Sequence, residues 1–110
     1  MSSKLICMGA GLASADPQLV YTVPGPEKAA MLTEVLLSSN GDRGEVHLWI
    51  LPPGQGIADP WRIQNAIDLL PKENRYITLA TVMQPGERLM IRAAAGSVSY
   101  RISGLEVDNV

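Results

Sequence analysis

Residues 98–103 read Val-Ser-Tyr-Arg-Ile-Ser, so apolar and polar side chains alternate one by one near the end of the chain. Successive side chains of a β-strand point to opposite faces, and this order therefore places Val, Tyr and Ile on one face. One buried and one solvated face is typical of a strand in an antiparallel sheet. We predict such a strand over residues 98–107, with Gly104 marking a bulge or a close approach.

Turn-forming residues recur at short intervals along the rest of the chain, which is typical of a β-sandwich or barrel. The apolar segments that they separate are residues 4–8, 18–23, 29–37, 45–51, 76–83 and 88–95. We predict an all-β fold, a single antiparallel β-sandwich of about seven or eight strands, of jelly-roll or immunoglobulin-like type.

Two turns have specific chemistry. Asn-Gly-Asp at residues 40–42 supplies the positive φ angles of a tight hairpin, so segments 29–37 and 45–51 are predicted to pair antiparallel. Gln-Pro-Gly-Glu at residues 84–87 places Pro and Gly where a turn between two further strands needs them.

Composition and charge limit the class of protein. The 110 residues include 9 Lys+Arg and 11 Asp+Glu, giving a net charge of −2, and 46% are hydrophobic. This fits one folded domain rather than a disordered chain. The basic residues are scattered singly, which argues against nucleic acid as a partner. Because Phe is absent, the core must be largely aliphatic.

The first residues imitate a secretory signal, with Lys4, an apolar run and then Ala-Ser-Ala at residues 13–15. The run is short and contains two glycines, so we predict a first strand over residues 4–8 that ends at a flexible Gly-Ala-Gly. The predicted organisation is a strand and flexible arm over residues 1–15 and a sandwich domain over residues 16–110. No apolar run approaches the ~20 residues that span a bilayer, and we expect no membrane partner.

Residues with catalytic or metal-binding chemistry are few. One His and one Cys exclude an intrachain disulfide and would leave a zinc site dependent on carboxylates, and a lone Cys suits a reducing compartment. The aspartates lie in or beside turns without the close spacing of a calcium loop. The glycine clusters lack the strand–helix setting of a phosphate loop. We predict no enzymatic activity, no catalytic residue, no metal and no cofactor.

Residues 59–70 support two interpretations. Asp59-Pro60 resembles a helix start, and Ile63, Ala66, Ile67 and Leu70 have helical spacing. The segment is short and lies in an otherwise β chain, so an extended connection is the alternative.

His47 and Trp49 are predicted to point outward together from the strand 45–51, as an interface anchor or a sugar-stacking surface. The alternative is that both faces of this sheet are buried. Trp61 and Arg62 end a Pro-rich loop, and residue types of this kind are enriched at binding hot spots. This loop either docks a neighbouring subunit or folds back to cap one end of the sandwich.

The predicted strand 4–8, which contains Leu5 and Ile6, is a further candidate for contact. It is expected to pair with an exposed sheet edge of its own subunit or of a neighbour.

From residue 19 onward the chain resembles a family of small phage virion β-sandwich modules. The matching elements are Leu-Val-Tyr-Thr-Val-Pro-Gly (19–25), Asn40, Gln-Asn-Ala-Ile (64–67), Met-Gln-Pro-Gly-Glu-Arg-Leu (83–89), Gly-Ser-Val (96–98) and Ile-Ser-Gly-Leu-Glu-Val (102–107). Pro26 and Trp61-Arg62 depart from the family pattern. The resemblance favours an extended connection at residues 59–70.

The resemblance implies a non-enzymatic structural protein of a phage particle, made in the host cytoplasm. Capsid decoration or cementing is the first expectation, with neck, tail or tail-fibre attachment as the alternative. The implied partners are the major capsid protein or neck and tail proteins, together with copies of the chain itself. A carbohydrate- or receptor-binding sandwich that uses Trp49, Trp61 and the tyrosines is the other alternative.

Overall fold

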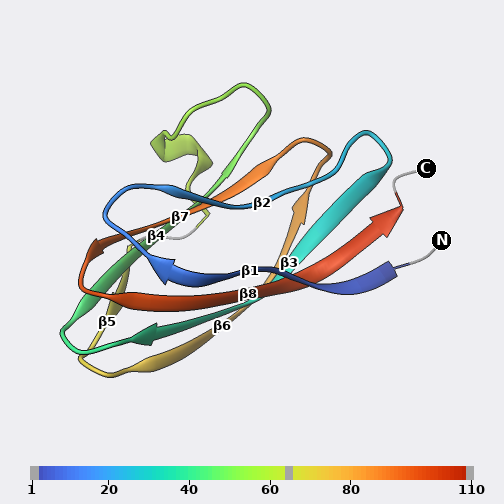
Figure 1. Ribbon diagram of the computed structural model, residues 1–110. Coiled ribbons are helices and arrows are strands. Elements are labelled where there is room, and N and C mark those ends of the chain that lie inside the picture. The colour runs from blue at the N-terminus through green and yellow to red at the C-terminus, as the bar shows by residue number, and fades with distance from the viewer. Residues whose placement is uncertain (1–2, 64–65, 109–110) are drawn as a thin grey trace.

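The computed structural model describes residues 3–63 and 66–108 (Figure 1). Its elements are β1 (Ser3–Ala13), β2 (Gln18–Thr22), β3 (Lys28–Ser39), β4 (Gly44–Leu51), the 3-10 turn η1 (Asp59–Trp61), β5 (Ile67–Leu69), β6 (Asn74–Met83), β7 (Arg88–Ala95) and β8 (Val98–Asp108). Within these residues no helix is long and apolar enough to cross a membrane.

The strands form two four-stranded antiparallel sheets that pack face to face (Figure 1). Sheet A has the order β1-β8-β3-β6, and sheet B has the order β2-β7-β4-β5. The chain thus folds back on itself as a long double ribbon, in which β1 pairs with β8, β2 with β7, β3 with β6 and β4 with β5. This double Greek key is a jelly roll, so the predicted antiparallel β-sandwich is confirmed.

The core between the sheets is aliphatic, as the lack of Phe requires. Its fully buried side chains are Val23, Leu32, Val35, Leu37, Val46, Leu48, Leu51, Leu69, Met83, Leu89, Ile91 and Ile102. On β8 the predicted alternation is confirmed, because Val98 and Ile102 are buried while Arg101 is exposed.

The predicted hairpin between segments 29–37 and 45–51 is wrong. These segments form β3 in sheet A and β4 in sheet B, and the chain crosses from one sheet to the other at Asn40-Gly41-Asp42. Both strands have an apolar face, and facing each other across the core buries both faces. Backbone bonds from Ser39 N to Glu73 O (2.8 Å) and from Asn40 N to Ser97 O (2.9 Å) hold the crossing.

The turn predicted at residues 84–87 is confirmed, with Gly86 at a φ of 82°. It too connects the two sheets, because it leads from β6 in sheet A to β7 in sheet B.

The helix interpretation of residues 59–70 is wrong, and the extended connection is confirmed. Among the described residues of this segment, 59–63 and 66–70, the only helical turn is η1, and β5 follows with Ile67 and Leu69 buried and Asp68 exposed. Ala66 and Leu70, which a helix would place on the same face as Ile67, are exposed. Burial in this segment therefore alternates from one residue to the next, as in a strand, and the helical spacing of its apolar residues is coincidental.

The first strand does not end at Met8, and this prediction is corrected. Strand β1 continues through the Gly-Ala-Gly stretch to Ala13 and pairs with β8 along its whole length. It does so with one extra residue near Met8, where the register shifts between Cys7 and Gly9. The flexibility of the glycines is overridden by pairing with a long central strand.

A bulge crosses sheet A at the level of Gly104. Strand β3 carries its own extra residue, Thr33, opposite the same point of β8, and Thr33 Oγ1 donates a hydrogen bond to Ser103 O. A side chain at Gly104 would overlap the carbonyl oxygen of Met31 and would approach Cε of Met8 to 2.5 Å. The predicted close approach is confirmed, and the aligned bulges bend the long strands of sheet A.

A hydrogen bond between two side chains joins the two sheets. Tyr21 on β2 donates a hydrogen bond to Glu106 Oε2 on β8 at 2.6 Å. Burial of the phenol, followed by this bond and the neighbouring carboxylate charge, raises the pKa of Tyr21 well above its ordinary value.

Candidate interaction surface

His47 and Trp49 lie side by side on the outer face of sheet B. Val46, Leu48 and Ile50 on the same strand, β4, point into the core, so the intervening side chains point away from it. The two rings are stacked, with centroids 5.8 Å apart and planes inclined by 17°. The predicted joint outward orientation of these two residues is confirmed.

The loop between β4 and β5 turns back over this pair. Arg62 pairs with Trp49 as an isolated bridge, and the Ile63 N–H donates to Leu48 O at 3.1 Å. The Arg62 guanidinium lies 5.8 Å from the centroid of the Trp49 ring, within reach of a cation–π interaction. As a result Trp49 is only 3% exposed. Its ring is covered by the chain itself and offers no stacking surface for a sugar.

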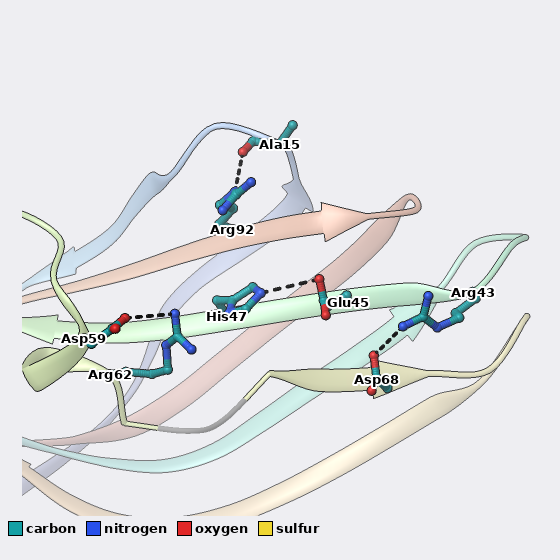
Figure 2. A network of polar contacts seen from close by, with 8 residues as sticks. All are labelled: Ala15, Arg43, Glu45, His47, Asp59, Arg62, Asp68 and Arg92. Carbon is teal, nitrogen blue, oxygen red and sulfur yellow. Dashed lines mark hydrogen bonds and ion pairs between the residues drawn. The ribbon is translucent and has the colours of Figure 1, made fainter.

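Charged side chains lie around His47, as Figure 2 shows. His47 Nε2 lies 3.6 Å from Glu45 Oε2, and Arg62 lies 3.4 Å from Asp59 Oδ1. Farther along, Arg43 pairs with Asp68 at 2.8 Å (Figure 2). The Arg43–Asp68 pair is exposed on both sides, and such a pair contributes about 0–1 kcal/mol, so its main effect is to keep this face polar.

The cluster contains three nitrogen atoms that are buried and have no hydrogen-bond partner in the described part of the chain. They are His47 Nδ1, Trp49 Nε1 and Arg62 Nε. A buried polar group without a partner costs about 1–3 kcal/mol, so these three side chains are held by packing, while backbone hydrogen bonds attach the loop to β4. Chemically, the indole N–H of Trp49 and the Nε–H of Arg62 suit a carbonyl or carboxylate acceptor. Gln64 and Asn65, the next residues along the chain, lie outside the described residues.

The structure brings together three of the predicted contact residues, His47, Trp49 and Arg62. Trp61 is half-buried in η1, and the end of the loop pairs with β4 along the same edge as β5 rather than lying across an end of the sandwich. Leu5 and Ile6 lie apart from this cluster, on β1 of sheet A. Ile6 packs against the core, whereas Leu5 is 81% exposed.

Sequence reasoning missed a row of apolar side chains on the outer face of sheet A. The register places Leu5, Leu105, Met31 and Val82 opposite one another on four adjacent strands, and we call these residues the apolar row. Leu5 and Val82 at its two ends are exposed, and the two central members are half-buried. The signal in the sequence is an apolar residue at an outward position of each strand, which only the register brings together.

The acidic residues do not gather. Glu45 lies near His47, Glu73 pairs with Arg75, and Glu106 accepts from Tyr21. Among residues 3–63 and 66–108, no three His, Cys, Asp or Glu side chains are grouped to hold a metal ion. The Leu70 N–H and then Arg75 donate to Glu73 and lower the pKa of its carboxyl.

Among the comparisons with known proteins, the comparison of structures gives a match. No protein-family model and no curated protein sequence matches it. A solved structure of Bacillus endospore appendages, described as a novel family of disulfide-linked pili, aligns with a TM-score of 0.56 and 14% identity. The alignment covers 97% of this chain and 87% of that one. A likeness at this identity shows a shared β-sandwich fold, and a place in a phage particle stays a prediction.

Proposed function

We propose that this chain is a non-enzymatic structural subunit that assembles with copies of itself or with other structural proteins. The observation that carries the proposal is the jelly roll with an apolar row left uncovered on the outer face of sheet A. Contiguous exposed apolar side chains on a soluble domain mark contact surfaces. The fold shared with a protein of bacterial pili supports a structural role, because fold and assembly go together in that example.

The finer proposal is a phage virion protein that decorates or cements the capsid. It is supported by the sequence resemblance over residues 19–107, whose turn elements at 24–25 and 83–89 lie in connections between the two sheets. A small compact domain also suits a protein present in many copies. Attachment at a neck or tail is the alternative within the same class, and the resemblance implies it equally.

The test is the copy number of the chain in purified particles, measured by quantitative mass spectrometry against the major capsid protein. Copies in a fixed ratio to the capsid protein would support decoration, and a handful per particle would support a neck or tail position. If the chain instead purifies with extracellular filaments, the structural role stands and the virion role is contradicted. Absence from particles and filaments alike would contradict the structural role itself.

Trp61 remains a proposed contact of the loop with a neighbouring protein. It is half-buried and belongs to a turn that lies against β4. Trp61→Ala should reduce incorporation into particles or filaments while the melting temperature changes little. Unfolding of this variant would show instead that Trp61 serves the packing of its own chain.

A further inference from the structure

The outer face of sheet A is almost free of charge. Every second side chain of β1, β3, β6 and β8 points away from the core. Among these outward side chains, only Glu34 and Arg101 carry a charge. The apolar row crosses all four strands on the same face. Depletion of charge around a patch of apolar side chains is the compositional mark of an interface core.

The two charged residues on this face complement each other. They lie on adjacent strands, because Glu34 is opposite Ser103 while Arg101 is two residues farther along β8. Neither forms an ion pair within the described residues. A face that carries one unpaired charge of each sign matches a copy of itself, because a two-fold axis brings Glu34 of one copy towards Arg101 of the other.

The size of the face is also sufficient. Four strands of about eleven residues, at ~3.3 Å per residue and ~4.8 Å between strands, cover roughly 700 Å². Stable interfaces of standard size bury about 600–1,000 Å² on each partner, and the face lies within this range. In Figure 1 the long loop that contains η1 lies on the side of sheet B, and no described segment crosses the outer face of sheet A.

We infer that the outer face of sheet A is a two-fold interface with a second copy of this chain. The inference deepens the proposed function and rests on it, because it names the partner and the surface of a subunit that assembles. The apolar row forms the centre of the contact, and the Glu34–Arg101 pairs fix the relative orientation of the two copies.

Cys7 is a built-in reporter of this contact. It is the only cysteine of the chain, it is exposed, and it lies opposite Ser103 on the same face, next to the apolar row. Alkylation by a maleimide therefore reports on one known position. If two copies cover this face, the rate of alkylation should fall as the protein concentration rises and recover on dilution.

The experiment combines this alkylation rate with the mass in solution from analytical ultracentrifugation. The wild-type chain should be a dimer with a protected Cys7. Leu105→Arg, at the centre of the face, should raise the dissociation constant about 100-fold, the effect of losing a strong hot spot. Leu5→Lys, at a position too exposed to affect folding, should raise it by a smaller factor. The matched control is Leu19→Lys, an exposed leucine opposite Met90 on sheet B, which should leave the dimer intact.

A wild-type monomer at concentrations up to about 1 mM, with a Cys7 that reacts at the same rate throughout, would overturn the inference. A monomer whose Cys7 is protected only inside purified particles would overturn it too, and would identify another protein as the occupant. Both results leave the proposed function standing. A dimer that is absent from every particle and filament would instead support the interface and contradict the proposed function.

Discussion

The two outer faces of the sandwich have opposite characters. On sheet B, the stacked pair His47 and Trp49 is covered by Arg62 of the chain's own loop, and Glu45 and Asp59 lie close by. On sheet A, the strands are longer and bent by aligned bulges, and they present the apolar row without any cover from the described chain. One face has therefore completed its packing within the subunit, while the other still has apolar surface to bury. The difference separates residues that serve the fold from residues that are free to serve assembly.

The largest expected effect tests the covered face. Trp49→Ala should lower the free energy of unfolding by about 3–5 kcal/mol, because it removes a large buried ring and leaves a cavity under the loop. Urea unfolding of the purified chain gives this value directly. Leu5→Ala on the uncovered face is the control and should change stability by no more than about 0.5 kcal/mol. Equal losses for the two variants would abolish the contrast between the faces.

Gly104→Ala tests the bend in sheet A. The added methyl group would overlap the carbonyl oxygen of Met31, so the strands must separate, at a cost of about 2–3 kcal/mol. Thermal unfolding measures the loss. Gly56→Ala, which meets no atom within 4 Å in the loop over sheet B, should be nearly neutral. A Gly104→Ala protein as stable as the wild type would mean that the bulges are not fixed by this contact.

Tyr21→Phe tests the hydrogen bond that joins the two sheets. It removes the hydrogen bond to Glu106 and should cost about 1.5 kcal/mol at neutral pH. The pKa of Tyr21 is raised on folding, so its contribution is fully present below the unfolded value of about 10 and is lost as the pH rises towards the folded value. The wild type should therefore lose stability above about pH 10, and Tyr21→Phe should lose less of it over that range. Identical alkaline profiles for the two proteins would rule out this role.

The smallest effect concerns the connection from sheet B to sheet A. The pKa of Glu73 is lowered by the Leu70 N–H and by Arg75, so its contribution is present above the unfolded value of about 4.3 and fades as the pH falls below it. Glu73→Gln should flatten the acid limb of the stability profile, measured by urea unfolding at a series of pH values. Glu87→Gln, which alters the carboxyl that accepts from Gln84 N in another exposed turn, provides a comparison.

The sequence predicted the strands better than their partners. Alternation located β8 closely and turn residues located β7, because period two and turn chemistry are local properties of the chain. The Asn-Gly turn specifies a reversal of direction but not the sheet in which the next strand lies. Strand β3 has β8 and β6 as its neighbours, which are distant in sequence, and no local signal encodes that choice. The predicted hairpin failed for this reason.

The candidate surfaces show the same contrast between features that follow from local spacing and features that depend on the folded chain. That His47 and Trp49 share a face follows from their spacing, and the structure confirms it. That Arg62 covers Trp49 depends on a loop folding back, which spacing does not show. The apolar row needs the register of four strands, and its members are spread from Leu5 to Leu105. Only the folded chain makes them neighbours.

The pairing of β1 with β8 has a consequence for synthesis. Strand β8 is synthesised after β1 and β3, its neighbours on either side in sheet A. A nascent chain that ends before Val98 therefore exposes two long strands with unpaired backbone edges, and such edges recruit other chains. Because the pairings join distant parts of the sequence, folding should be slow for a domain of this size. A pause in translation just before the codons of β8 should consequently favour aggregation far more than a pause before those of β2.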